Sequence, residues 1–165
     1  MALSSEVTSL VTEIHRALLE AGQSVSTAES LTGGGLSSAL TYVPGSSQTF
    51  VGGITAYRSH VKIEQLQVDR ELIEEFGVVS LEVADAMALG ALKIFGSTWA
   101  ISTTGVAGPG PSDGVAAGTV WIAIAGPVTH RFQLALDGER EVVRNATIAS
   151  AIATFARILR DQRGK

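Results

Sequence analysis

The sequence predicts a three-layer α/β domain, in which helices cover both faces of a mixed β-sheet. Helix and strand patterns alternate over the first two thirds of the chain, which is typical of parallel strands joined by helices. Near the C-terminus two strand patterns follow one another across a short turn that contains Gly126-Pro127, which predicts an antiparallel hairpin. The chain contains no linker, repeat or low-complexity tract, so we expect one domain over residues 1–165.

The composition indicates a globular protein without thiol chemistry. A length of 165 residues can enclose a core, and 45% hydrophobic residues argue against disorder. The absence of cysteine excludes disulfides, thiolate metal sites and cysteine nucleophiles. A net charge of −4 gives no general attraction for nucleic acid. No uncharged apolar run has the length of a membrane span, and the N-terminus does not resemble a signal peptide. We therefore expect a cytoplasmic protein without nucleic-acid or membrane partners.

The first half of the chain carries most of the helix patterns. Apolar residues at helical spacing predict a helix over residues 5–21. The elements expected next are a strand at 25–28, a helix at 36–43, a strand at 50–57, and helices at 60–66, at 69–77 and after Ser80. Gly52 and Gly53 inside the second strand predict a bulge or a close approach of another backbone. The helix after Ser80 is expected to turn Val83, Met87, Ala91 and Ile94 inward.

The second half begins with a strand at 99–103 and then a glycine- and proline-rich loop at 105–118. Strands at 119–125 and 130–136 form the expected hairpin, and a last helix is expected at 139–160. Long loops in compact domains are often functional, so the loop at 105–118 is a candidate for ligand binding.

The most informative stretch is residues 27–35, where a strand gives way to a helix. Ser30 is placed on the turn, and the glycines after it allow a substrate to approach the backbone. Thr32, Gly33 and Gly34 lead into the helix start, whose free N–H groups can hold an anion or an oxyanion. The alternative is a capped helix start, in which Ser30 and Thr32 only satisfy backbone donors.

A second stretch offers a base for Ser30. A serine hydroxyl is a weak nucleophile until another group takes its proton, and a lysine can do so where burial lowers its pKa. Tyr57 ends the second strand and Lys62 lies on the following helix, so both can face one cleft. The alternative is that Lys62 is a solvated helix lysine and Tyr57 packs at the sheet edge.

Two further segments are candidates for substrate binding. Thr104 and Gly105 follow a strand end, where open α/β sheets bind ligands, although the segment has no P-loop sequence and can be an ordinary turn. Arg140 and Arg144 are four residues apart near a helix start, which suits a phosphate clamp. Alternatively, both arginines are exposed and paired with neighbouring glutamates.

Other hydrolytic chemistries lack their motifs. The three histidines (His15, His60 and His130) are scattered, and no His-Glu-x-x-His sequence is present, so we expect no metal and no cofactor. A Gly-x-Ser-x-Gly elbow and a Gly-x-Gly-x-x-Gly fingerprint are also absent.

Seven motifs, in order along nearly the whole chain, resemble the CinA C-terminal domain family. They are Thr27-Ala28-Glu29-Ser30-x-Thr32-Gly33-Gly34, Val43-Pro44-Gly45-Ser46-Ser47, Tyr57 with Lys62, Gly77-Val78-Val79-Ser80, Thr104-Gly105-x-Ala107-Gly108-Pro109, Gly118-Thr119-Val120-Trp121 and Gly138-x-Arg140. The resemblance implies a single amidohydrolase domain that converts nicotinamide mononucleotide to nicotinate mononucleotide and ammonia, and it also implies a homo-oligomer. The chain departs from the family in the short loop 111–117 and in residues 58–61, which differ from the usual Ser-Asn-x-Ala.

The resulting hypothesis has Ser30 attack the carboxamide while neutral Lys62, assisted by Tyr57, accepts its proton. Backbone N–H groups around residues 32–34 or at Gly105 stabilise the oxyanion, and the two arginines hold the phosphate. Water activation by Lys62 is a second route. An alternative assigns the nucleophile or a ligand contact to Ser46 or Ser47. The competing class is a non-catalytic nucleotide-binding or regulatory module.

Overall fold

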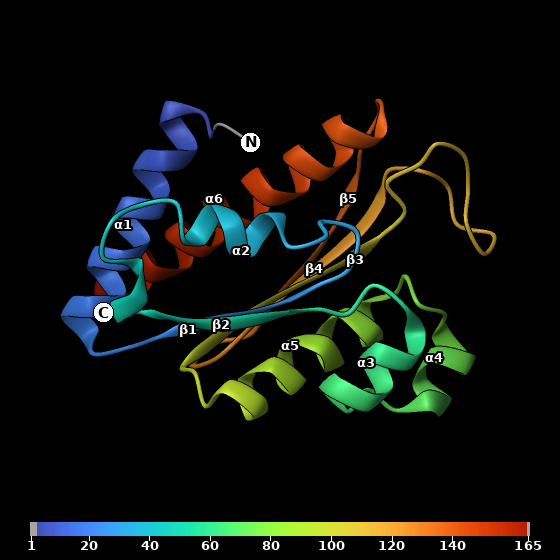
Figure 1. The fold of residues 1–165 in the computed structure, drawn as a ribbon, viewed down its shortest axis with the longest axis horizontal. Coiled ribbons are helices and arrows are strands. Elements are labelled where there is room, and N and C mark those ends of the chain that lie inside the picture. Colours follow the sequence, from blue (N-terminus) through green and yellow to red (C-terminus); the bar gives the residue numbers. More distant parts are fainter. Residues whose placement is uncertain (1–2, 165) are drawn as a thin grey trace.

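The computed structural model describes residues 3–164 and contains a five-stranded sheet between two helical layers (Figure 1). Met1, Ala2 and Lys165 of the expected domain lie outside the described residues. The strands are β1 (Val25–Glu29), β2 (Phe50–Thr55), β3 (Trp99–Gly105), β4 (Thr119–Ala125) and β5 (His130–Ala135). Their order is β2-β1-β3-β4-β5; β1 is parallel to β2 and β3, whereas β4 and β5 form the antiparallel hairpin. The predicted mixed sheet in a three-layer α/β fold is confirmed.

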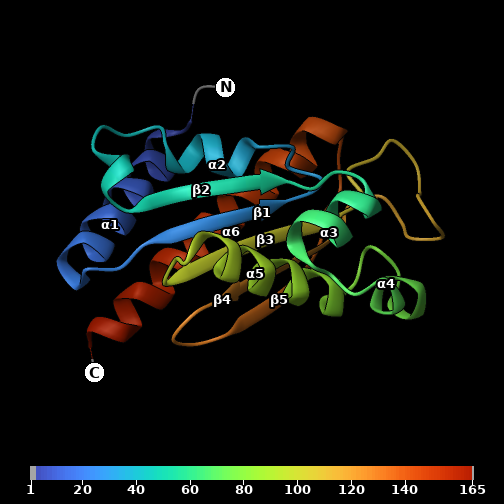
Figure 2. The same cartoon turned by 60° about the horizontal axis from the view of Figure 1, so that its bottom comes forward.

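Helices lie on both sides of the sheet (Figures 1 and 2). On one face lie α1 (Ser5–Ala21), α2 (Gly35–Leu40) and α6 (Arg140–Arg163). On the other lie α3 (Ser59–Leu66), α4 (Arg70–Phe76) and α5 (Leu81–Phe95). A short 3-10 helix, η1 (Ser46–Gln48), precedes β2. The larger core cluster forms between α1, α2, α6 and the sheet, because these helices and the strands present buried Leu, Ile, Val and Phe side chains to one another.

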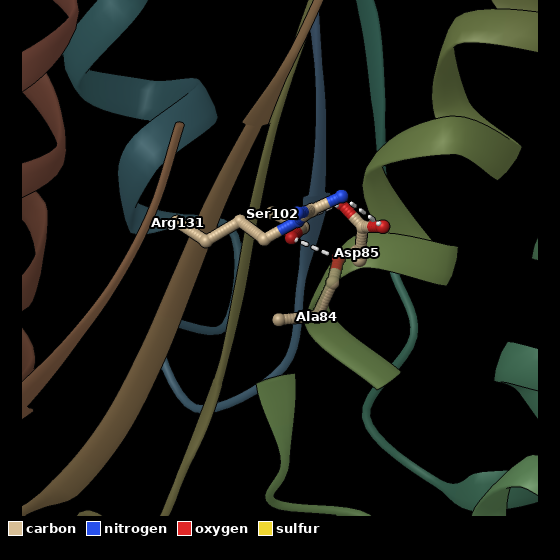
Figure 3. A network of polar contacts seen from close by, with 4 residues as sticks. All are labelled: Ala84, Asp85, Ser102 and Arg131. Carbon is tan, nitrogen blue, oxygen red and sulfur yellow. Dashed lines mark hydrogen bonds and ion pairs between the residues drawn. The ribbon is translucent and has the colours of Figure 1, made fainter. Parts of the chain in front are cut away.

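Small side chains allow α5 to lie close to the sheet. Ala84 and Ala88 of α5 pack against Ala123 and Ala125 of β4 in a cluster of buried alanines. Two polar contacts tie α5 to the sheet (Figure 3): Ser102 Oγ donates to the Ala84 carbonyl at 2.5 Å, and Arg131 forms a bidentate ion pair with Asp85, with Nε–Oδ1 at 2.8 Å. Helix α3, which carries Lys62, packs against α5.

The structure corrects three details of the sequence prediction. The strand expected at 50–57 ends at Thr55, so Tyr57 follows this strand and does not end it. The helix expected at 36–43 ends at Leu40, because a residue before proline, here Val43, is sterically disfavoured in the α conformation and Gly45 takes a φ of 83°. Ile94 does not point inward: it is 42% exposed on the last turn of α5. The expected irregularity at Gly52 is present as a register shift between β1 and β2.

One helix, α6, is long and apolar enough to cross a membrane by length and composition, with a mean hydropathy of 1.3 over the relevant window. Half of this window is buried inside the domain, as in the core helix of a globular fold. Its buried residues include Ile148, Ile152 and Phe155, which pack in the core cluster against the sheet.

Candidate active site

A cavity of about 370 Å³ opens at the carboxyl ends of β1 and β3. Because these strands are parallel, their ends meet at one edge of the sheet, which is where α/β folds bind ligands. Its wall is formed by Ser30 and Leu31, residues 57–59, Val78 and Val79, residues 104–113 and Arg140. Segments that are far apart in the sequence therefore meet at this cavity.

Ser30, in the cavity wall, is in contact with the buried Lys62. The side chain of Lys62 is fully buried, and its Nζ lies 3.1 Å from Ser30 Oγ and 2.7 Å from the carbonyl oxygen of Ala56. None of the ion pairs formed within residues 3–164 involves Lys62. Burial lowers the pKa of Lys62 from 10.5 to about 8. A neutral Lys62 can donate to Ala56 and use its lone pair to accept the proton of Ser30.

The turn after β1 fixes the position of Ser30. The Ser30 N–H donates to Thr103 O at 2.9 Å, which extends the pairing with β3 by one residue. Gly33 N donates back to Ser30 O at 3.0 Å and closes a four-residue turn. Gly33 and Gly34 have φ values of 60° and 92°, which residues with a side chain rarely adopt. The two glycines therefore allow the chain to turn between β1 and α2. Ser30 remains 8% exposed, on the cavity side.

The N–H groups at the start of α2 are not free, contrary to the prediction. The carboxylate of Glu29 accepts from Gly34 N at 3.1 Å, Leu36 N at 2.9 Å and Ser37 N at 2.7 Å. It also accepts from Ser37 Oγ at 2.6 Å. Gly33 and Gly34 therefore cannot offer their amides to an oxyanion. Glu29 was missed in the sequence, although an acid directly before a glycine-rich helix start is a signal for such capping.

Thr32, Thr104 and Gly105 have different surroundings. Thr32 is fully buried, with its Oγ1 2.8 Å from Thr103 Oγ1, and it supports the turn from behind the cavity wall. Thr104 lies in the wall and donates from Oγ1 to Val78 O at 2.9 Å, which joins two lining segments. Gly105 also lies in the wall, where an added Cβ would come within 2.7 Å of Thr119 O.

Tyr57 and Arg140 meet across the mouth of the cavity. Arg140 donates from Nη2 to the Tyr57 hydroxyl at 2.5 Å and from Nη1 to Gly108 O at 2.9 Å. Tyr57 is 52% exposed, and within residues 3–164 its hydroxyl is bonded to Arg140 and not to Ser30 or Lys62. In this arrangement Tyr57 orients the arginine and is not placed to relay the proton of the serine.

Arg144 lies one turn further along α6 and behind the turn that carries Ser30. Its Nη2 donates to Thr32 O at 3.0 Å, and an added Cβ at Gly33 would come within 3.1 Å of Nη2. Its Nε is buried and has no hydrogen-bond partner among the described residues. Arg140 therefore lines the cavity, whereas Arg144 is half-buried, is not part of the cavity wall and has an unused donor.

Ser46 and Ser47 lie at the other end of the sheet. They form η1, which leads into the amino end of β2, whereas Ser30 follows the carboxyl end of the parallel strand β1. Five residues of β1 separate the two ends, or roughly 15 Å. The structure does not bring these serines together with Lys62. They lie beside a second hollow of about 310 Å³ between α1 and residues 43–49. Residues 3–164 contain no group of three or more His, Asp or Glu side chains that could hold a metal ion.

Comparison with known proteins adds a family to this geometry. Residues 7–159 match the model of the CinA C-terminal domain. A CinA-like protein of Shewanella denitrificans is 41% identical over 159 residues, covering 94% of this chain and 37% of that protein. A CinA-like protein of Gloeothece citriformis is 42% identical over 147 residues, covering 86% of this chain and 35% of that protein. The chain thus spans about a third of the length of these relatives.

Solved structures share the fold over almost their full length. A competence/damage inducible protein CihA from Agrobacterium tumefaciens superposes with a TM-score of 0.90 at 33% identity, covering 97% of this chain and 99% of that one. A competence damage-inducible protein A from Klebsiella pneumoniae gives 0.88 at 32% identity, covering 92% and 95%.

Proposed function

The chain belongs to the CinA C-terminal domain family, and we propose that it hydrolyses the carboxamide of nicotinamide mononucleotide to nicotinate mononucleotide and ammonia. The observation that carries this proposal is the contact between Lys62 Nζ and Ser30 Oγ, at 3.1 Å in a buried site. A lysine with a pKa of about 8 is neutral often enough near neutral pH to act as a general base. A serine beside such a base is an activated nucleophile for acyl transfer.

In the first half of the reaction, Ser30 Oγ bonds to the carboxamide carbon and its proton passes to Lys62 Nζ. The carbonyl oxygen carries the negative charge of the tetrahedral intermediate. Collapse of this intermediate breaks the C–N bond, and Lys62 returns the proton to the leaving nitrogen, so that ammonia departs. An acyl ester on Ser30 and a neutral Lys62 remain.

In the second half, a water molecule takes the place of ammonia. Lys62 accepts a proton from the water as its oxygen attacks the ester carbon, and it then gives the proton back to Ser30 Oγ. Nicotinate mononucleotide is released and the enzyme is regenerated. Lys62 ends each half-reaction neutral, which is why a base with a pKa near the working pH suits this cycle.

Two arginines support a phosphorylated substrate. Arg140 lies in the cavity wall, and Arg144 has a buried Nε without a partner among the described residues. Charge-assisted hydrogen bonds from guanidinium groups are well suited to a phosphate. The domain is acidic overall, with a net charge of −4, so binding relies on this local pair rather than on long-range attraction. As expected from the sequence and from the family resemblance, we further propose that the protein is a cytoplasmic homo-oligomer that needs no metal and no cofactor.

Ammonia release from purified protein tests the proposal. Nicotinamide mononucleotide should yield ammonia and nicotinate mononucleotide in equal amounts, and the unphosphorylated riboside should react more slowly. Tight binding of the mononucleotide with no ammonia release would overturn the proposal and favour a non-catalytic nucleotide-binding module.

A further inference from the structure

Glu29 is a buried acid without a cationic partner. Its side chain is fully buried, and none of the ion pairs among residues 3–164 includes it. Four donors hold the carboxylate instead: Oε2 accepts from Gly34 N and Leu36 N, and Oε1 accepts from Ser37 N and Ser37 Oγ. A carboxylate buried in this way costs free energy unless such donors surround it, so the turn and the acid depend on each other.

The hydrogen bonds of the turn leave two amides unused. Gly33 N and Gly35 N donate to Ser30 O and Thr32 O, and three of the next amides donate to Glu29. Leu31 N and Thr32 N have no acceptor among the described residues, although both residues are almost completely buried. Buried backbone N–H groups are nearly always paired, so two adjacent unpaired ones indicate a place for an acceptor from outside the chain.

These two amides directly follow Ser30, and Leu31 lies in the cavity wall. Resting on the function proposed above, we propose that Leu31 N and Thr32 N hold the oxyanion and that Glu29 is the positioning residue that directs them there. Glu29 engages the donors of the turn beyond residue 33 and anchors α2, which leaves the two amides directly after the nucleophile as the donors without an acceptor among residues 31–37.

Replacement of Glu29 by glutamine separates this role from simple packing. Glutamine has nearly the same volume, but its NH₂ group replaces one carboxylate oxygen. The N–H groups of this amide then face either the donors of Ser37 or the N–H groups of Gly34 and Leu36, with which they cannot form hydrogen bonds. The turn must then shift, and the two amides lose their direction. Because an oxyanion hole acts in the transition state, kcat of Glu29→Gln should fall by about 10²-fold or more while KM changes less than about threefold. Ser37→Ala, which removes one of the four donors, should show a smaller loss, and Glu74→Gln, an exposed acid on α4, none.

The thioamide of nicotinamide mononucleotide provides a readout that a structural role would not change. Sulfur accepts hydrogen bonds poorly, so an intact oxyanion hole favours the oxygen amide over the thioamide. The ratio of kcat for amide and thioamide should therefore be smaller in Glu29→Gln than in the wild type. An unchanged ratio, or an unchanged kcat in a folded Glu29→Gln variant, would overturn the inference.

A measurement on the wild type covers the case in which Glu29→Gln fails to fold. The aldehyde analogue of nicotinamide mononucleotide should form a hemiacetal: Ser30 Oγ bonds to the aldehyde carbon, the Ser30 proton passes to Lys62 Nζ, and the former carbonyl oxygen enters the hole with a negative charge. Backbone amide NMR signals of Leu31 and Thr32 should shift downfield on binding, more than those of Gly34, Leu36 and Ser37. Shifts at Ala107 and Gly108 instead, in an enzyme that does release ammonia, would refute this inference alone. A wild type that releases no ammonia would refute the proposed function itself.

Discussion

A buried basic side chain lies near each end of the parallel strands, and the two side chains differ in what they contact. At the carboxyl end, burial lowers the pKa of Lys62 to about 8; at the amino end, burial likewise lowers the pKa of His15. Both ring nitrogens of His15 are engaged, Nε2 with Leu40 O at 2.6 Å and Nδ1 with Thr49 Oγ1. Lys62 instead contacts a hydroxyl that opens to a cavity. A shifted pKa therefore marks a reactive base only where a nucleophile and open space accompany it.

The largest expected effect tests which end holds the nucleophile. Ser30→Ala should lower kcat for amide hydrolysis by about 10⁴-fold or more, because the attacking group is lost. Ser46→Ala and Ser47→Ala, at the other end of the sheet, serve as matched controls and should retain activity within about twofold. Measuring ammonia release by the three variants, with circular dichroism to check their folding, shows which serine is required for hydrolysis. If Ser30→Ala kept nearly the activity of the wild type, the nucleophile would not be Ser30, and Ser46 or Ser47 at the other end of the sheet would be the next candidate.

The pH dependence tests whether Lys62 is the working base. Because the reactive form is the neutral amine, kcat/KM should rise with pH and level off above an apparent pKa of about 8. At pH 6 it should be about 100-fold below the plateau. Lys62→Met should lack measurable turnover, and His15→Gln should keep the wild-type profile. A profile that follows His15 instead of Lys62 would contradict the assignment.

The arginines should affect substrate binding more than turnover. Loss of one charge-assisted phosphate contact in Arg140→Ala or Arg144→Ala should cost about 1.5–3 kcal/mol, or raise KM about tenfold to hundredfold. The turnover number should fall less, because the phosphate is remote from the scissile amide. Both variants should also lose part of the preference for the mononucleotide over the riboside. If KM and this preference stay unchanged in both, the phosphate binds elsewhere, with the loop 105–110 as the next candidate.

The smallest effect concerns His15, and it should appear in stability rather than activity. Burial lowers the pKa of His15 in the folded protein, so at mildly acidic pH the unfolded chain binds the proton more readily. The free energy of unfolding should therefore fall as the pH drops below about 6.5. His15→Phe should lose about 1–3 kcal/mol at pH 7.5, since two buried partners are left without a hydrogen bond, and it should show a weaker pH dependence. Urea unfolding at pH 5 and 7.5 measures both; an unchanged pH dependence would contradict the role of His15.

The hydrophobic periodicity of the sequence was sufficient to predict the three layers of the fold, the antiparallel hairpin and most boundaries of the helices and strands. The pattern could not show that Lys62 is buried: this residue follows His60 and Val61 on a short helix, and its amine contacts Ser30 and Ala56, which lie in other segments of the chain. The sequence also did not show which donors bind the Glu29 carboxylate. It shows an acid before a helix start, but not the direction in which the carboxylate points. The placement of Ser46 and Ser47 followed from the parallel pairing of β1 with β2, which is a property of the sheet and not of the local sequence.

The strand order also has a consequence for how the protein folds. Strand β1 lies between β2 and β3, and the contact between Ser24 and Thr98 closes a separation of 74 residues. The contact of Arg144 with Thr32 spans 112 residues. Non-local pairings of this kind must overcome a large loop-closure entropy and form slowly. The cavity is lined by segments spread from Ser30 to Arg140, so it is complete only when the whole domain has folded. We expect activity to return only after the last helix has docked, so that a catalytic assay would report the final step of refolding.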